Sequence, residues 1–117
     1  MSETDLSRGI RQALTAAGCW VIRQQSGTIP LVRNGKTRMI CMGEPGVPDL
    51  LVMFPAAFPT PEHGMDWGFL EVKTAKGRLS PAQVQWHERA ASLGINCRVV
   101  RGIADAVNVV KGWRFQG

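Results

Sequence analysis

Apolar residues recur at steps of three and four positions near the start of the chain, a spacing that puts them on one face of a helix. The pattern predicts a helix that begins near Glu3 and ends before Gly18. Acidic Glu3 and Asp5 suit the positive end of its dipole, so the first turn supports the same prediction. The apolar stripe consists of Leu6, Ile10, Leu14 and Ala17.

Strand-forming residues and a turn signal follow this helix. Residues 19–23 (CWVIR) are rich in side chains that favour strands, and they predict the first strand. The dipeptide Asn34-Gly35 tolerates the positive φ angles of a tight turn. It therefore predicts a hairpin between residues 29–33 and residues 37–42.

Two short and nearly continuous apolar runs predict the central strands of a sheet. They are residues 49–54 (DLLVMF) and residues 67–72 (WGFLEV), and the first follows a predicted loop at 44–48 (EPGVP). The Pro-rich connection between the two runs, residues 55–66, has no clear periodicity. We expect a surface loop there.

A second helix start is visible near residue 80. Ser80 is a typical N-cap, Pro81 occupies the first helical position, and Gln83 stands three residues after the cap, as in a capping box. Gly94 is well placed to end this helix in the left-handed conformation. Residue types and spacing therefore predict a helix from Ser80 to about Gly94.

The remaining chain predicts one more strand and one more helix. Residues 96–101 (NCRVVR) favour a strand, and apolar residues from Ile103 to Val110 mark a short helix. Residues 113–115 either return to the sheet edge or pack over the sheet. The predicted order is αβ(ββ)ββαβα, which indicates an α/β fold.

Length and composition limit the class of protein. A chain of 117 residues can enclose one core, so we expect a single domain over residues 1–117. The chain contains no long apolar run and has an acidic N-terminus, so we expect no membrane span and no signal peptide. The cysteines are few and widely spaced, which favours a reducing cytoplasm. They are Cys19, Cys41 and Cys97.

The charge favours a polyanionic partner such as DNA or RNA. Fourteen Lys and Arg against nine Asp and Glu give a formal charge of +5 and a pI near 9.7. Two clusters of basic residues have two possible interpretations: they bind phosphates, or they are ordinary solvated surface. The first cluster is Arg23, Arg33, Lys36 and Arg38, and the second is Lys73, Lys76 and Arg78.

Two carboxylates stand where the chain should be most buried. Asp49 and Glu71 lie at or inside the predicted central strands, where an ionised side chain costs several kcal/mol unless it is paired or binds a cation. Glu71 and Lys73 are two residues apart and share one face of their strand, while Val72 points into the core. If the two strands are neighbours, these polar groups converge on a site for a divalent metal such as Mg²⁺ or Mn²⁺.

Such a site suits phosphodiester hydrolysis. Asp49, Glu71 and a backbone carbonyl, that of Val72, would hold the metal. Lys73 would position or deprotonate the attacking water, or stabilise charge on phosphorus. The alternative from the residues alone is an ordinary ion pair between Glu71 and Lys73, with Asp49 capping a turn after Pro48.

The same residues resemble a known group. Pro48-Asp49 followed by Glu71-Val72-Lys73 is similar to the PD-(D/E)XK motif of a nuclease superfamily. The surrounding segments resemble the VRR-NUC family within it, and the likeness runs from about Glu3 to Val107. These segments are Ser2-Glu3, residues 46–50 (GVPDL), 69–73 (FLEVK) and 77–83 (GRLSPAQ).

The resemblance implies a restriction-endonuclease-like mixed β-sheet flanked by helices and a Mg²⁺- or Mn²⁺-dependent DNA endonuclease. It implies that Asp49 and Glu71 bind the metal, that Lys73 is catalytic, and that Gln83 and Glu3 are site residues on the helices, with Glu3 near the metal. Small stand-alone relatives resemble homodimers that act on branched DNA such as four-way junctions. A non-catalytic nucleic-acid-binding module with the same fold is the competing hypothesis.

Several other polar and aromatic residues have simpler interpretations. Gln83 also completes the capping box, and it can serve both roles, whereas Gln85 should lie on another side of the helix. His63 and His87 lack partners at metal-site spacing, so solvated or packing roles are favoured. The tryptophans either stack on bases or belong to the core, and the core is the more common place. They are Trp20, Trp67, Trp86 and Trp113.

Overall fold

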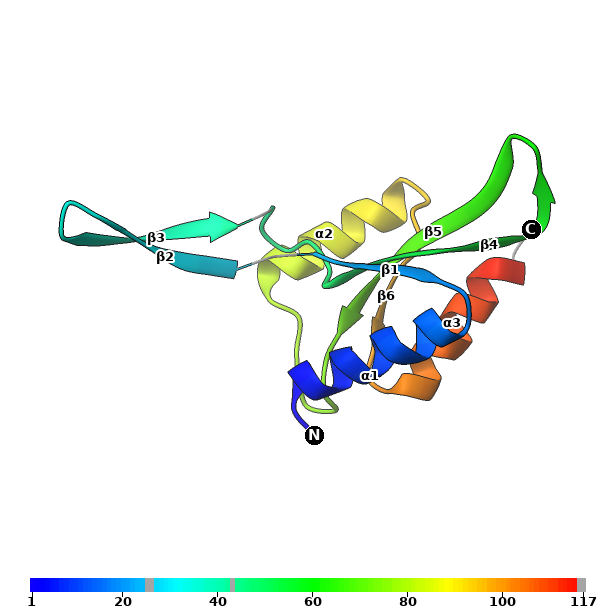
Figure 1. Ribbon diagram of the computed structural model, residues 1–117, viewed down its shortest axis with the longest axis horizontal. Coiled ribbons are helices and arrows are strands. Elements are labelled where there is room, and N and C mark those ends of the chain that lie inside the picture. Colours follow the sequence, from blue (N-terminus) through cyan, green and yellow to red (C-terminus); the bar gives the residue numbers. More distant parts are fainter. Residues whose placement is uncertain (25–26, 43, 116–117) are drawn as a thin grey trace.

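The computed structural model describes residues 1–24, 27–42 and 44–115 and has the predicted order of elements (Figure 1). In chain order the elements are α1 (Glu3–Ala16), β1 (Trp20–Arg23), β2 (Gly27–Arg33), β3 (Lys36–Met42), β4 (Leu50–Thr60), β5 (His63–Val72), α2 (Pro81–Ser92), β6 (Cys97–Val100) and α3 (Ile103–Phe115). The sequence of helices and strands, αβ(ββ)ββαβα, is therefore confirmed.

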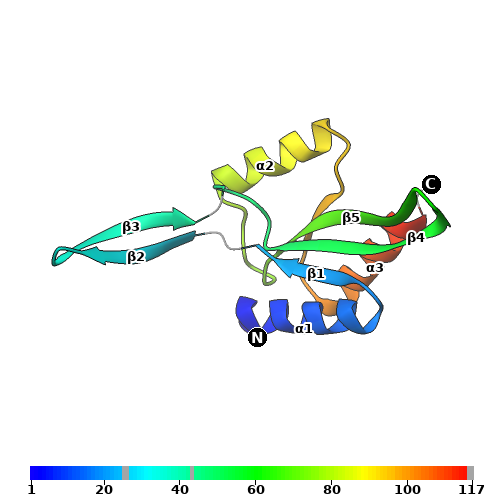
Figure 2. The ribbon, with the colours of Figure 1, turned by 45° about the horizontal axis from the view of Figure 1, so that its top comes forward.

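Four strands form the central sheet in the order β1-β4-β5-β6. Neighbours among β1, β4 and β5 are antiparallel, and β6 runs parallel to β5, so the sheet is mixed. Helices α1 and α3 cover one face, and α2 lies over the other (Figure 2). The fold is a mixed α/β sheet flanked by helices, as predicted.

The core lies between the sheet and the helix pair α1 and α3. Alternate residues of β4, namely Leu50, Val52 and Phe54, are buried on this face. The Phe54 ring stacks on the Trp113 ring with centroids 6.2 Å apart. Burying each such side chain contributes roughly 1.5–3 kcal/mol. Trp113 thus packs over the sheet from within α3, and a return of residues 113–115 to the sheet edge is excluded.

The predicted surface loop at residues 55–66 is wrong. β4 continues to Thr60 and β5 begins at His63, so the strands form one long hairpin with an irregular register between Pro55 and Thr60. β1 pairs with β4 only as far as Met53, so within the described ranges no strand pairs with this edge of β4 beyond that point. A proline lacks an N–H, and a free strand edge tolerates it.

Strands β2 and β3 form a separate two-stranded hairpin, residues 27–42, which we call the arm. Its turn is the one expected at Asn34-Gly35, and both residues have positive φ, 52° and 70°. Within the part of the chain that the structure describes, β2 and β3 contact no other helix or strand. The arm therefore projects from the body along the long axis of the molecule (Figure 1).

Helix α2 begins as predicted. Ser80 is its N-cap, Pro81 stands in the first turn, and the capping box with Gln83 is formed. The tryptophans divide between core and surface: Trp113 is buried and Trp86 is half-buried, whereas Trp20 and Trp67 are 65% and 47% exposed. The expectation of a core position is wrong for the last two.

Two observations bear on the expectations drawn from composition. Cys19 and Cys97 are free thiols, and Cys41 has a side chain outside the described residues. Among the described residues, no helix has the length and apolar character needed to cross a membrane.

Two glycines test the packing of α3 on the sheet. A Cβ on Gly68 would lie 2.5 Å from the Trp113 ring and 2.8 Å from Asn96 Cβ, so we expect Gly68→Ala to lower the free energy of unfolding by about 1–3 kcal/mol through overpacking. Gly112 in α3 has nothing within 4 Å of a Cβ, so Gly112→Ala is expected to stabilise the helix by about 0.5–1 kcal/mol. Urea unfolding of both variants measures this, and equal effects would contradict the packing described.

Candidate active site

The ends of β4 and β5 bring the two predicted carboxylates together. Leu50 pairs with Leu70 in antiparallel register, so the next two positions toward the end of the sheet, Asp49 and Glu71, lie opposite each other. The backbone N–H of Asp49 donates to Glu71 Oε2 at 3.1 Å, and the backbone N–H of Val72 donates to Asp49 Oδ2 at 2.8 Å. Each carboxylate is thus held by the backbone of the opposite strand.

Glu71 is the centre of this cluster. Its side chain is only 1% exposed, although it lies on the sheet face opposite to the main core. Lys73 Nζ lies 4.0 Å from Glu71 Oε1, and the side-chain amide of Gln83 donates a hydrogen bond to the same oxygen. An ammonium, an amide and two carboxylates therefore meet at one end of the sheet.

Gln83 serves the helix and the carboxylate at the same time. Its Oε1 accepts a hydrogen bond from the Ser80 backbone N–H at 2.8 Å, and its own backbone N–H donates to Ser80 Oγ at 3.2 Å. Its Nε2 is thereby turned toward Glu71. Gln85 is exposed on another side of α2. The capping box therefore orients the amide that binds the buried acid.

The environment of Glu71 disfavours its charged form. Burial is the main cause, and the side chain of Asp49 adds a hydrogen bond and like-charge repulsion; together they raise the pKa of Glu71 to about 8. Lys73 and the backbone hydrogen bond from Asp49 act in the opposite direction and are weaker. Without a cation, this carboxyl therefore keeps its proton to a higher pH than an ordinary glutamate does.

This donor set fits a hard divalent cation. Two adjacent carboxylates with unfavourable negative charge, next to the backbone at Val72, are the kind of oxygen ligands that Mg²⁺ and Mn²⁺ prefer. The described residues contain no group of three or more His, Cys, Asp or Glu able to hold a metal by themselves. Glu3 lines a pocket together with Asp49 and Arg23, so it faces the same region from α1.

The loop after Lys73 is held by a residue that the sequence reasoning missed. This residue is Arg101, whose Nη1 donates hydrogen bonds to the backbone carbonyls of Thr74 and Gly77, at 2.6 Å and 2.8 Å. A Cβ on Gly77 would lie 3.3 Å from the Lys73 side chain, so the loop closely borders that lysine. An arginine just after a strand carries no local signal of this role.

The cations that the sequence predicts to bind DNA lie on several elements. Arg23 is exposed and lines the pocket at Asp49, and Lys76 and Arg78 are exposed in the loop after Lys73. Lys36 and Arg38 are exposed on the arm. The side chain of Arg33 lies outside the described residues. The basic residues that the structure describes therefore occupy β1, the loop and the arm.

The two histidines lie outside the carboxylate cluster. His63 bonds Asp66 at 2.6 Å near the exposed turn of the β4–β5 hairpin. His87 Nδ1 lies 3.4 Å from Cys97 Sγ, and burial lowers the pKa of His87 and is the main cause that raises the pKa of Cys97 to about 12. His63 is exposed, and His87 is half-buried beside Cys97.

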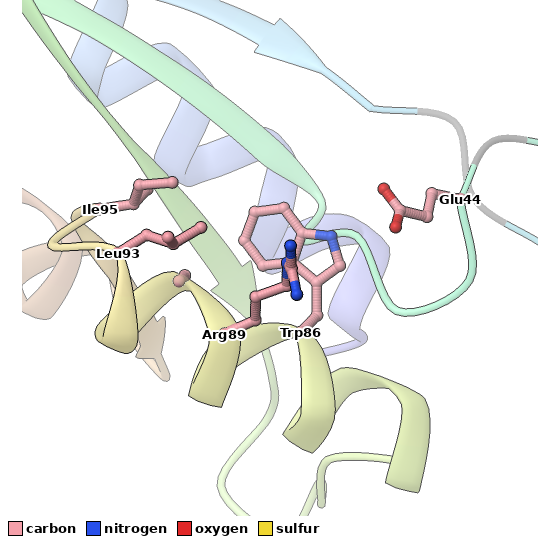
Figure 3. Close-up of a pocket in the computed structure, with 6 residues that line it drawn as sticks. Glu44, Trp86, Arg89, Leu93 and Ile95 are labelled. Atoms are coloured by element: carbon pink, nitrogen blue, oxygen red, sulfur yellow. The ribbon is translucent and has the colours of Figure 1, made fainter.

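A second hollow lies along α2, between this helix, the segment that follows it and the loop residue Glu44 (Figure 3). It contains none of the candidate catalytic side chains, so it is distinct from the pocket at Asp49. Its lining residues are Glu44, Trp86, Arg89, Ala90, Leu93 and Ile95.

Comparison with known proteins identifies the fold. A solved structure described as a VRR_NUC domain superposes with a TM-score of 0.61 and 23% sequence identity, covering 95% of this chain and 96% of that chain. No protein-family model and no curated protein sequence matches this chain. The mixed sheet with its flanking helices is restriction-endonuclease-like. More narrowly, the chain has the VRR-NUC fold that the motifs resembled.

The raised pKa of Glu71 leads to a stability prediction. The unfolded chain loses this proton near pH 4.5 and the folded chain near pH 8, so the stability that Glu71 contributes is present below pH 4.5 and is lost as the pH rises through 8. Glu71→Gln stays neutral throughout. In EDTA we expect its stability relative to wild type to rise by at least about 1.4 kcal/mol, one pKa unit, between pH 5 and pH 9.

Thermal unfolding across this pH range measures the difference, with the exposed Glu88→Gln as the matched control. A constant difference between Glu71→Gln and wild type would show that the Glu71 carboxyl titrates normally.

Gln83 provides a second test of the site. Gln83→Ala removes part of the helix cap and one donor to a buried carboxylate, so we expect a loss of about 1–2 kcal/mol in the free energy of unfolding. Gln85→Ala, on the exposed side of the same helix, is expected to change it by less than about 0.5 kcal/mol. Denaturant titration distinguishes the two, and equal losses would contradict the double role of Gln83.

Proposed function

We propose that the protein is a metal-dependent DNA endonuclease that hydrolyses phosphodiester bonds. The observation that carries this proposal is the pair of reciprocal hydrogen bonds between the Asp49 and Glu71 strand ends, with Lys73 Nζ 4.0 Å from Glu71 Oε1. Two acids and one ammonium at the end of a sheet are the groups that this hydrolysis requires. The VRR-NUC fold supports the same reading.

Asp49, Glu71 and the backbone carbonyl of Val72 would hold Mg²⁺ or Mn²⁺, with Glu3 as a further acidic group at the same pocket. When bound, the ion supplies Lewis-acid polarisation of the phosphate and acidification of the attacking water. Lys73 positions or deprotonates that water, or stabilises charge on phosphorus. Gln83 orients Glu71 through its side-chain amide.

The basic residues would bind the DNA backbone. Lys76 and Arg78 follow the catalytic strand directly, and Arg23 lines the pocket at Asp49. Lys36, Arg38 and Arg33 extend this charge onto the arm. Phosphate contacts position the DNA without reading its sequence. This arrangement suits an enzyme that recognises the shape of DNA.

Branched DNA, such as a four-way junction, is the substrate that we propose, and a homodimer is the assembly. Both rest on the resemblance to small VRR-NUC proteins. A two-fold pair would present two active sites to two strands. Sedimentation of the purified protein measures the assembly, and a monomer with full junction-cleaving activity would contradict it.

The cleavage assay tests the proposed function directly. Labelled linear, flap and four-way-junction DNA is incubated with wild type, Asp49→Asn or Lys73→Met in Mg²⁺, Mn²⁺ or EDTA. We expect metal-dependent cleavage by wild type and a loss of at least about 100-fold in each variant, because each removes a group from the chemical step. DNA affinity in EDTA and the melting temperature should remain close to wild type.

Lys111→Met, on the exposed face of α3, is the matched control and should cleave normally. Thermal shifts give a readout that does not depend on activity: Mn²⁺ should stabilise wild type and should not stabilise Asp49→Asn. DNA binding without any metal-dependent cleavage would instead favour the non-catalytic module.

A further inference from the structure

The arm, residues 27–42, stands apart from the other helices and strands that the structure describes. β2 and β3 pair along seven residues each, and within the described residues they contact no other strand or helix. An isolated two-stranded hairpin is only marginally stable in water. Figures 1 and 2 both show it extended away from the sheet. These features suit an element that is completed by binding a partner.

The charge of the arm is complementary to nucleic acid. No Asp or Glu occurs between Gln24 and Gly43, whereas three cations do. Lys36 and Arg38 are exposed, and because they are two residues apart on β3 they share one face of the ribbon. Asn34 and Thr37 are also exposed. A two-stranded ribbon of this kind fits a DNA groove and its cations reach the flanking phosphates.

The root of the arm lies beside the candidate metal site. β1 ends where Arg23 pairs with Leu50, and the Gln24 backbone N–H donates to the Asp49 carbonyl at 2.7 Å. The arm is therefore inserted next to Asp49, and its far end lies about one arm length away. Seven strand residues at about 3.4 Å each span about 24 Å. Along the helix axis of DNA each strand carries one phosphate per about 3.4 Å, so an arm that lies along this axis reaches across about seven base pairs.

We infer that the arm grips duplex DNA about seven base pairs from the scissile phosphate and sets the length of flanking duplex that the active site uses. This inference rests on the proposed function for its second part, because a flank is defined by the cut. The first part, DNA binding by the arm, is independent of catalysis.

Binding in EDTA tests the first part with the full chain. Lys36→Gln combined with Arg38→Gln should weaken binding to a 24-base-pair duplex by about tenfold and reduce the salt slope by about two, one for each phosphate contact. The matched control is Arg98→Gln combined with Lys111→Gln, two exposed cations on β6 and α3. The melting temperature should not change in either pair. Equal effects of the two pairs, or none, would overturn the inference.

Cleavage tests the second part. Once the cut is mapped, the duplex on each side of it is trimmed in steps of two base pairs. On one side, kcat/KM should fall about tenfold when the flank drops below about seven base pairs. In the Lys36→Gln and Arg38→Gln pair, kcat/KM should be low at every length. A loss that does not depend on flank length would place these cations at the site and overturn the inference.

A shortened arm provides the sharpest comparison. Residues 29–30 pair with residues 39–40, so removing these four residues shortens the ribbon by two pairs and keeps the turn and its cations. The threshold should then move down by about two base pairs. An unchanged threshold would overturn the inference. If wild type binds DNA through the arm and cleaves none of the substrates, the proposed function fails while arm-dependent binding remains.

Discussion

Two hydrogen bonds that cross between the ends of β4 and β5 hold the candidate active site together. In these bonds each carboxylate accepts a hydrogen bond from a backbone N–H of the opposite strand end. The side chains thereby extend the pairing of the two strands beyond their last backbone hydrogen bonds. The register of the sheet therefore places Asp49 and Glu71 side by side. The burial of a charged Glu71 remains unfavourable, since the backbone N–H of Asp49 and the Lys73 ammonium offset only part of the cost. A proton on Glu71, or a divalent cation, removes the remaining repulsion.

Much of the fold follows from local sequence patterns. The stripe on α1, the Ser80 cap of α2 and the turn at Asn34-Gly35 are each determined within a few residues. The structure agrees with all three except at Ala17, which is exposed at the end of α1 and does not belong to the buried stripe. The sequence predicts a loop at residues 55–60, where the structure has a strand, because prolines usually interrupt strands. Whether Pro55 is tolerated depends on where β1 ends, which is a property of the sheet and not of the segment.

Part of the candidate site could be predicted from the sequence because its residues conflict with their local pattern. Asp49 and Glu71 interrupt apolar strands, and such a conflict between a charge and its surroundings can be detected from sequence. Arg101 produces no conflict, since an arginine at the end of a strand is ordinary. Its hydrogen bonds to Thr74 and Gly77 join segments more than twenty residues apart, and these emerge only from the tertiary structure. Likewise the hairpin at 27–42 was predictable, whereas its isolation from the body was not.

Gly46 connects the loop before Asp49 to the helix that carries Gln83. Its φ is 84°, and a Cβ there would lie 2.3 Å from the Ala82 carbonyl oxygen, in the first turn of α2. The two backbones touch with no room for even a methyl group. Any replacement must displace the loop or the start of α2, which carries the amide that holds Glu71. Steric exclusion therefore limits which residues can occupy position 46. Although glycine takes no part in the chemistry, we expect this position to tolerate substitution as poorly as the neighbouring acids do.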